Sequence, residues 1–210
     1  MNFKCVLAIG AHVDDVEFGC GGTLARFIAE GVEVHYMAFS IMEESVLEPW
    51  PKDIMGTHLK EAMKRLGITL DKIAVLDYPV RKIGYSRQEV LEDLVLAKGL
   101  IHPDLVLLPS TRDIHQDHST VAAEGVRAFR DTTVLGYEMP WSNTRFDAGA
   151  YITLSEGQLW KKVWVLDAYE SQKYRHYHDE DMIRGLAMVR GAQVKAKYAE
   201  AFEVVRWVMK

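Results

Sequence analysis

Short, almost continuously apolar runs alternate along the 210-residue chain with longer segments in which apolar residues recur three or four positions apart. The short runs are rich in β-branched residues, as is typical of strands buried on both faces of a sheet. They cover residues 3–9, 32–39, 73–78, 105–108 and 134–138. The longer segments have the spacing of amphipathic helices. They cover residues 23–30, 54–66, 88–101 and 118–129.

The last third of the chain has a weaker pattern. It predicts one more strand at 151–154 and helices at 155–168 and 180–191, and we take residues 198–202 as helical. Strands that alternate with crossover helices predict an α/β fold with a mostly parallel sheet. Ligands of such sheets bind beyond the carboxyl ends of the strands. Residues that directly follow a strand are therefore the first candidates for chemistry.

Length and composition narrow the class of protein. A chain of 210 residues that is 49% hydrophobic and 26% charged fits one globular domain over residues 1–210. The net charge of −5 argues against a nucleic-acid partner, because phosphate binding needs a basic face. No apolar run has the length of a membrane span. Cys5 and Cys20 cannot make a disulfide framework, so we expect a cytoplasmic protein with two reduced thiols.

A cluster of metal-ligand and acid–base residue types follows the first predicted strand, in the segment His12-Val13-Asp14-Asp15-Val16-Glu17. An imidazole and a carboxylate three residues apart, His12 and Asp15, can both bind one zinc ion. The adjacent carboxylate of Asp14 then stays free to act as a base. The alternative is an acidic turn that caps the next helix, with Asp14 or Asp15 as the N-cap.

Glycines follow this cluster in the segment Gly19-Cys20-Gly21-Gly22. The glycine fingerprint of dinucleotide-binding folds is incomplete, because Leu24 stands where the third glycine is needed. We expect these glycines to allow close packing of the backbone around the site.

A second cluster follows the fourth predicted strand and contains Asp113, His115, Asp117 and His118. Hydrolytic zinc sites commonly use three protein ligands and leave a fourth position to water. His12, Asp15 and one histidine of this cluster form such a set. His118 opens a predicted helix, so its ring can point back toward the sheet. His115 then faces the substrate, with Asp117 orienting its imidazole.

The two clusters together resemble those of the PIG-L/LmbE-like deacetylases, which are zinc-dependent N-acetyl hydrolases of glycoconjugates and related small molecules. That family carries an AHPDD-x-E segment and an HPDH-like segment, matched here by residues 11–17 and 115–118. The segment Tyr198-Ala199-Glu200-Ala201-Phe202 is also similar to one branch of the family. The resemblance implies a Rossmann-like three-layer fold.

Carried over to matching positions, the resemblance implies metal ligands at His12, Asp15 and His118 and a general base at Asp14. It implies that His115 stabilises the oxyanion or donates a proton, with Asp117 behind it. Two prolines of the family pattern are replaced by Val13 and Gln116, which removes no ligand. Many family members carry an arginine that contacts substrate in the loop after the second strand. The corresponding residues 40–45 contain no arginine here, so the sequence leaves the substrate open.

Other strand ends supply candidates for substrate binding. These are Arg81 after the third strand, and Trp141, Asn143 and Arg145 after the fifth. We expect a zinc-dependent amide hydrolase that removes an acetyl group from a sugar-like small molecule, with Fe²⁺ as another candidate metal.

Two other functions remain open on the sequence. One is a non-catalytic metal-binding domain, and the other is a nucleotide- or cofactor-binding α/β enzyme. The spacing of Trp160 and Trp164 favours a core or subunit-interface position and so allows a homo-oligomer.

Overall fold

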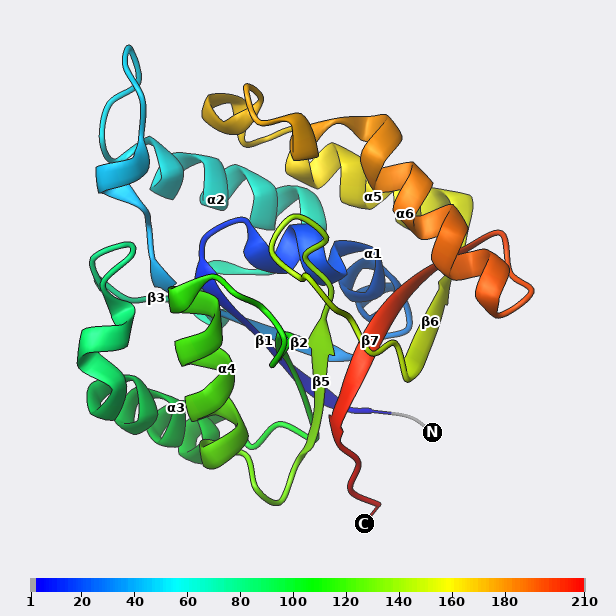
Figure 1. The fold of residues 1–210 in the computed structure, drawn as a ribbon, viewed down its shortest axis with the longest axis horizontal. Helices are drawn as coiled ribbons and strands as arrows, with labels where there is room; N and C mark the ends of the chain where they lie inside the picture. The colour runs from blue at the N-terminus through cyan, green and yellow to red at the C-terminus, as the bar shows by residue number, and fades with distance from the viewer. Residues whose placement is uncertain (1–2, 210) are drawn as a thin grey trace.

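The computed structural model describes residues 3–209 as helices packed against one seven-stranded sheet (Figure 1). The strands lie in the order β3-β2-β1-β4-β5-β7-β6. Pairing is parallel from β3 to β5 and antiparallel at β7 and β6, which confirms the mostly parallel α/β fold. The strands are β1 (Cys5–His12), β2 (Glu33–Ser40), β3 (Ile73–Val75), β4 (Leu105–Pro109), β5 (Thr133–Tyr137), β6 (Ala150–Leu154) and β7 (Tyr198–Arg206).

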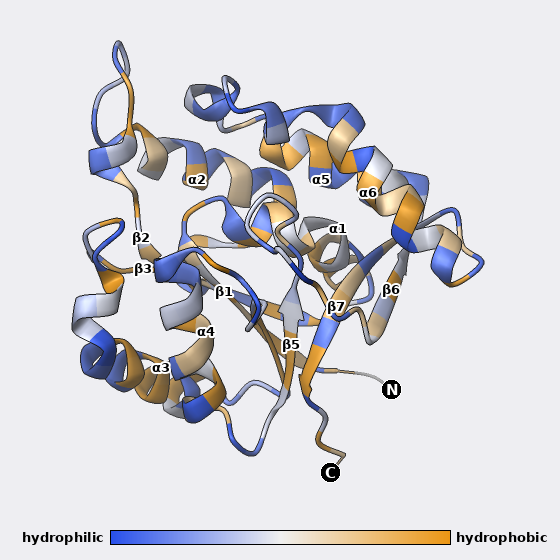
Figure 2. Ribbon diagram, viewed as in Figure 1, coloured by the Kyte–Doolittle hydropathy of each residue, from blue (hydrophilic) through white to orange (hydrophobic). Residues whose placement is uncertain are grey.

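Helices cover both faces of the sheet and complete three layers (Figure 1). They are α1 (Asp15–Ala29), α2 (Ile54–Leu66), α3 (Arg87–Ile101), α4 (Gln116–Ala128), α5 (Glu156–Leu166) and α6 (Glu180–Gln193). Strand side chains alternate between the layers, as the period of two requires. Val6 and Ala8 pack in the core beneath α1, α2, α5 and α6, and Leu7 and Ile9 in the core beneath α3 and α4. Figure 2 shows apolar and polar residues alternating along α3.

Helix α1 begins eight residues before the predicted start at Thr23, because it consists of two parts. The backbone at Cys20 is not helical (φ −146°, ψ 21°) and interrupts the helix. The carboxylate of Glu200 accepts hydrogen bonds from the N–H groups of Gly22 and Thr23, directly after the interruption, at 3.1 and 2.6 Å. This carboxylate caps the second part, which is the part that the apolar pattern predicts.

The prediction of a helix at residues 198–202 is wrong, because these residues begin strand β7. Glu200 is buried rather than solvated, and its carboxylate lies 2.6 Å from Nζ of Lys162 on α5. Glu203, further along the strand, accepts a hydrogen bond from the hydroxyl of Ser110 at 2.8 Å. Two acidic residues are therefore paired inside a strand that lies between β5 and β6.

The lengths of the helices and the exposure of two tryptophans test two further predictions. The longest helices, α1 and α3, have 15 residues each, and no helix within residues 3–209 combines the length and apolar character that a bilayer crossing requires. Trp160 and Trp164 stack on each other with 52% and 37% of their surface exposed. A core position for these tryptophans is thus wrong, and the subunit interface and the single domain over residues 1–210 stay predictions.

Candidate active site

Strands β1 and β4 are neighbours in the sheet, so the segments that follow them meet at the same edge. Val6 of β1 pairs with Leu105 of β4 in parallel register. His12 is the last residue of β1, and the loop after β4 leads into α4. Helix α4 begins at Gln116, two residues before the predicted start, so His118 lies in its first turn. The structure thereby brings the two predicted clusters together.

Ligand-type atoms of three side chains, His12, Asp15 and His118, come close together at this edge, and we call this group the triangle. Nδ1 of His12 lies 3.4 Å from Oδ2 of Asp15, and Nε2 of His118 lies 3.3 Å from Oδ1 of the same carboxylate. The two ring nitrogens are 3.2 Å apart. Ligand atoms held about 2.0–2.1 Å from a tetrahedral zinc ion lie about 3.3–3.4 Å from one another. The two ring nitrogens and the Asp15 oxygens have this spacing, each oxygen lying near a different imidazole, and all three side chains are buried.

Each histidine of this triangle is held by a carboxylate on its far nitrogen. Nε2 of His12 lies 2.9 Å from Oδ2 of Asp117, and Nδ1 of His118 lies 2.8 Å from Oδ2 of Asp113. Such contacts fix the tautomer and ring orientation of a metal-binding imidazole. The Asp117 carboxylate contacts His12 rather than His115, so the prediction that Asp117 orients the His115 imidazole is met only by its backbone N–H.

His115 occupies the N-cap position of α4 and faces the triangle. Its Nδ1 accepts a hydrogen bond from the backbone N–H of Asp117 at 3.2 Å. Burial is the largest cause that lowers the pKa of His115 to about 4, followed by the charges of His118 and His12. A neutral ring with Nδ1 as acceptor carries its proton on Nε2. A nitrogen of His115 also lies within 4.8 Å of ligand nitrogens of His12 and His118, so a metal group of three histidines is a second arrangement.

Asp14 has the backbone strain often found at functional sites. Its φ of 114° lies in the left-handed region that non-glycine residues rarely adopt. It holds the N-cap position of α1, but its side chain makes no capping hydrogen bond, so the alternative of a simple capping turn loses its support. Burial, reinforced by the neighbouring Asp15, raises the pKa of Asp14 well above its ordinary value.

A cavity of about 260 Å³ opens over these residues. Beside the triangle, its walls contain the aromatic rings of Phe18, Trp141 and Tyr177 and the guanidinium groups of Arg81 and Arg175. Trp141 and Tyr177 stack with ring centroids 4.0 Å apart, and Phe18 meets both edge to face. The cavity therefore combines the triangle, the Asp14 carboxylate, an aromatic wall and two arginines.

The glycines after the first cluster pack closely, as expected. A Cβ atom on Gly19 would lie 2.1 Å from the ring of Tyr137, and one on Gly22 would lie 2.5 Å from Leu154.

Comparison with known proteins identifies the family. The model of the PIG-L family, described as GlcNAc-PI de-N-acetylase, matches residues 7–129. The chain belongs to the PIG-L family. It is a deacetylase, an amide hydrolase of that family. It is similar to an uncharacterized deacetylase, YaiS, of Escherichia coli K12, with 29% identity over 80% of this chain and 91% of YaiS.

Two further relatives extend the comparison. Diacetylchitobiose deacetylase of Thermococcus kodakarensis is 27% identical over 60% of this chain and 49% of its own length, so the match spans about half of that protein. The conserved protein TT1542 of Thermus thermophilus has the same fold, with a TM-score of 0.82, 24% identity and coverage of 98% of this chain and 96% of that one. This likeness to TT1542 agrees with the LmbE-like fold that the sequence predicts.

Of the four residues that the sequence nominates for substrate binding in this PIG-L deacetylase, Arg81 and Trp141 line the cavity. Asn143 and Arg145 are not among the described residues that line it. Oδ1 of Asn143 accepts a hydrogen bond from the backbone N–H of Met139 at 2.6 Å, which shapes the loop after β5. Arg145 is exposed and pairs with Asp147 at 3.1 Å. A part in substrate binding stays a prediction for both residues.

Sequence reasoning misses three residues of the site. Asp113 belongs to the second cluster, but the sequence assigns it no role, and it holds His118. Arg175 and Tyr177 come from the segment between α5 and α6, which has no periodic pattern and no strand end to mark it. The sequence feature that comes closest to indicating Arg175 and Tyr177 is the density of aromatic and polar side chains in residues 170–178.

Proposed function

We propose that this deacetylase is zinc-dependent and removes an acetyl group from the nitrogen of a sugar-like small molecule. His12, Asp15 and His118 are the proposed ligands. The observation that carries the proposal is the convergence of their ligand atoms, with nitrogen–nitrogen and nitrogen–oxygen distances of 3.2 to 3.4 Å. An Asp15 oxygen lies 3.4 Å from the ring nitrogen of His12 and another lies 3.3 Å from that of His118, so we prefer Asp15 to His115 as the third ligand.

A bound zinc ion supplies Lewis acidity and lowers the pKa of a coordinated water toward neutrality. The Asp14 carboxylate accepts a proton as the water attacks the acetyl carbonyl carbon. Asp14 suits this role by position, because it is buried in the cavity wall next to Asp15 in the chain. The N–H at Nε2 of His115 donates a hydrogen bond to the carbonyl oxygen as negative charge develops there. Asp14 then returns the proton to the leaving nitrogen.

Asp117 and Asp113 act through the two histidines that they hold. Their contacts occupy one nitrogen of each ring, and the other nitrogens, Nδ1 of His12 and Nε2 of His118, lie 3.2 Å apart. We therefore treat both aspartates as positioning residues, and Asp14 and His115 as the groups that meet the substrate.

The name of the relative from Thermococcus kodakarensis supports an acetylated amino sugar as the substrate class. The stacked rings of Trp141 and Tyr177 support it as well, because an aromatic face can pack against a sugar ring. Ligand pockets commonly range from about 300 to 1,000 Å³. A cavity of about 260 Å³ therefore favours a substrate that inserts a single ring.

The test combines elemental analysis with an assay for released amine. Purified protein should contain about one zinc or iron ion per chain, and a chelator should abolish release of amine from N-acetylglucosamine derivatives. Added zinc should restore the activity. Metal-free protein with full activity would overturn the metal proposal. Stoichiometric metal without amine release from any acetylated sugar would overturn the substrate class.

A further inference from the structure

The segment between α5 and α6 brings a second cation into the cavity, and buried contacts hold this segment in place. The hydroxyl of Tyr169 donates a hydrogen bond to Glu17 on α1 at 2.5 Å. Ser171 lies 3.3 Å from Nδ1 of His58 on α2, and Gln172 donates to Ser171 at 3.2 Å. Ser171 and Gln172 are only 3% and 2% exposed. These buried contacts therefore fix the segment in place as one wall of the cavity.

Arg175 is held in this wall by neutral partners alone. Its Nε donates to Oε1 of Gln172 at 2.7 Å, and its Nη1 donates to the hydroxyl of Tyr177 at 2.5 Å. The guanidinium also lies over the rings of Tyr174 and Tyr177, at 5.4 and 5.6 Å from their centroids. Within residues 3–209, Arg175 forms no ion pair, and its Nη2 has no hydrogen-bond acceptor.

A half-buried guanidinium without a counter-ion is unfavourable unless something else supplies the negative charge. Burial disfavours the charged form of Arg175, whereas the negative charge of the Asp14 carboxylate favours it. A divalent cation at the triangle would balance the charges of Asp14 and Asp15. Asp117 and Asp113 contact the imidazoles of His12 and His118, so neither of these carboxylates pairs with Arg175.

Arg81 differs from Arg175 in its surroundings. Its side chain is 56% exposed, and its Nη2 lies 3.8 Å from Glu44 at the cavity rim. Its charge is therefore partly satisfied within the protein and screened by solvent. Arg175 is the cation of the cavity that is both preorganised and unpaired.

We propose that Arg175 is an anion-binding, specificity-determining residue, and that the preferred substrate carries a carboxylate or phosphate group in addition to its acetylated nitrogen. The proposal rests on the proposed function, because it concerns the same cavity. A guanidinium suits both anions, since its planar fork can donate two parallel hydrogen bonds. Acetylated sugars with phosphate or carboxylate groups are therefore better substrates than neutral ones.

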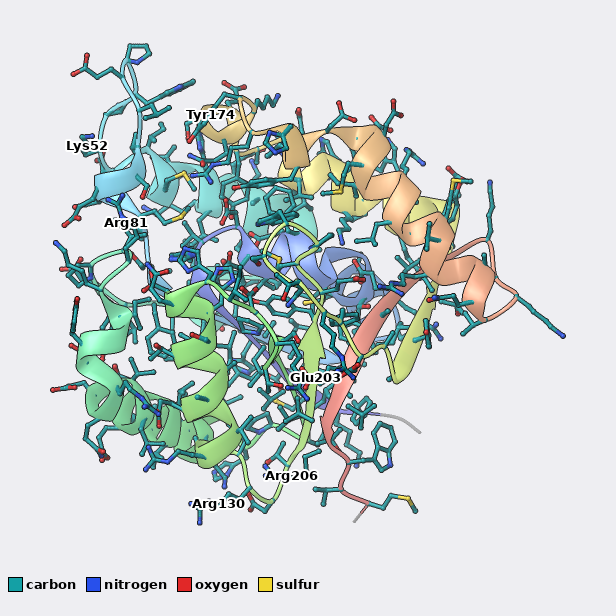
Figure 3. All side chains as sticks on the ribbon, viewed as in Figure 1. Lys52, Arg81, Arg130, Tyr174, Glu203 and Arg206 are labelled. Carbon is teal, nitrogen blue, oxygen red and sulfur yellow. The ribbon has the colours of Figure 1, made fainter. Side chains whose placement is uncertain are left out.

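The experiment compares three substrates on the zinc-loaded full chain. They are N-acetylglucosamine, N-acetylglucosamine 6-phosphate and N-acetylmuramic acid, which are neutral, phosphorylated and carboxylated. The variants are Arg175→Gln, Arg175→Lys and the control Arg130→Gln. Arg130 is exposed and lies at the end of the molecule opposite to Arg81 and Tyr174 in Figure 3.

The natural protein should turn over one or both charged substrates with a higher kcat/KM than the neutral one. A hydrogen bond to a charged group contributes enough that Arg175→Gln should lower the charged-to-neutral ratio of kcat/KM about 10- to 100-fold, mostly through KM. Arg175→Lys should retain part of the preference, and Arg130→Gln should retain all of it. The charged substrate whose kcat/KM falls more in Arg175→Gln shows whether Arg175 prefers phosphate or carboxylate.

Two results would overturn the proposal. One is natural protein that does not prefer either charged substrate. The other is an Arg175→Gln variant that loses kcat equally on all three substrates, because Arg175 would then act through Asp14. If no substrate is hydrolysed, calorimetric binding of glucosamine 6-phosphate against glucosamine still tests Arg175. Equal binding of the two by natural protein would refute the anion site separately from the deacetylase substrate class.

Discussion

Oδ2 of Asp117 lies 2.9 Å from Nε2 of His12, across 105 positions of sequence. The same carboxylate accepts hydrogen bonds from the backbone N–H groups of Arg81 and Ile83 at 2.5 and 3.2 Å. One side chain at the start of α4 therefore orients an imidazole at the end of β1 and fastens the turn that carries a cation of the cavity. Asp113 supports His118 in the same way but makes no contact with that turn.

Replacement of Asp117 by asparagine should weaken metal binding. The amide can no longer accept from His12 and both backbone N–H groups at once, so the ring of His12 loses its fixed orientation. Loss of such a partner typically costs about 10- to 100-fold in metal affinity. Competition with a chromophoric chelator measures the change. Asp53→Asn is the control, because Asp53 is exposed and makes no capping hydrogen bond at the start of α2. Unchanged affinity in Asp117→Asn would contradict the role of Asp117.

The sequence predicts much of this site because the chemistry follows strand ends. The β1 and β4 runs are apolar throughout, and each leads directly into its cluster of polar side chains. Which carboxylate meets which imidazole depends on the helix start. Helix α4 begins at Gln116 rather than His118, and this turns the Asp117 side chain toward His12 and away from His115.

Two features could not be predicted from local pattern. Strand β7 contains Glu200 and Glu203, which suggest a solvated segment, yet each finds a partner more than 30 residues away in sequence. Arg175 reaches the cavity through a segment of short turns whose position depends on buried contacts with α1 and α2. Long-range pairing decides both cases, and a single sequence does not display it.

Asp14 and His118 should differ in what their loss removes. Asp14→Asn should retain the metal and lose about 10²- to 10⁴-fold in kcat, because a general base contributes about that much. His118→Ala should lose the metal as well as the activity. Metal content and amine release, measured on the same preparations, separate the two effects. Near-normal turnover in Asp14→Asn would mean that another group acts as the base.

The buried pair of Lys162 and Glu200 should be sensitive to loss of one member. Both side chains are about 6% exposed, with Nζ and Oε1 2.6 Å apart. Lys162→Met should destabilise the protein by about 3–5 kcal/mol, because it leaves a buried charge unpaired. The double variant Lys162→Met/Glu200→Gln should recover part of the loss. Urea denaturation measures both.

Lys197→Met is the control for that comparison. Lys197 pairs with Glu156 at the exposed surface, where solvent screens the charges, so its loss should change stability little. A Lys162→Met variant as stable as the control would mean that the buried pair contributes no more to stability than the exposed one.

The thiol of Cys5 should resist alkylation until the pH is high. Burial, followed by the charges of Glu33 and Asp104, raises the pKa of Cys5 to about 11. Only the thiolate reacts, and at pH 8 roughly one molecule in a thousand would carry it. Iodoacetamide labelling followed by mass spectrometry should therefore speed up about tenfold per pH unit up to about pH 11. Glu33→Gln should shift the profile to lower pH, and labelling at pH 8 as fast as that of a free thiol would contradict the predicted burial.

Alanine at Gly19 and alanine at Gly56 should have opposite effects on stability. A Cβ on Gly19 would overlap the ring of Tyr137, which is fully buried and held by a hydrogen bond from its hydroxyl to the carbonyl of Ile9 at 2.9 Å. The ring cannot move aside, so Gly19→Ala should cost roughly 1–3 kcal/mol. Gly56 lies in α2, and a Cβ added there would have no neighbouring atom within 4 Å, so Gly56→Ala should stabilise the helix by roughly 0.5–1 kcal/mol. Denaturation midpoints that move in the same direction in both variants would refute the close approach of α1 to β5.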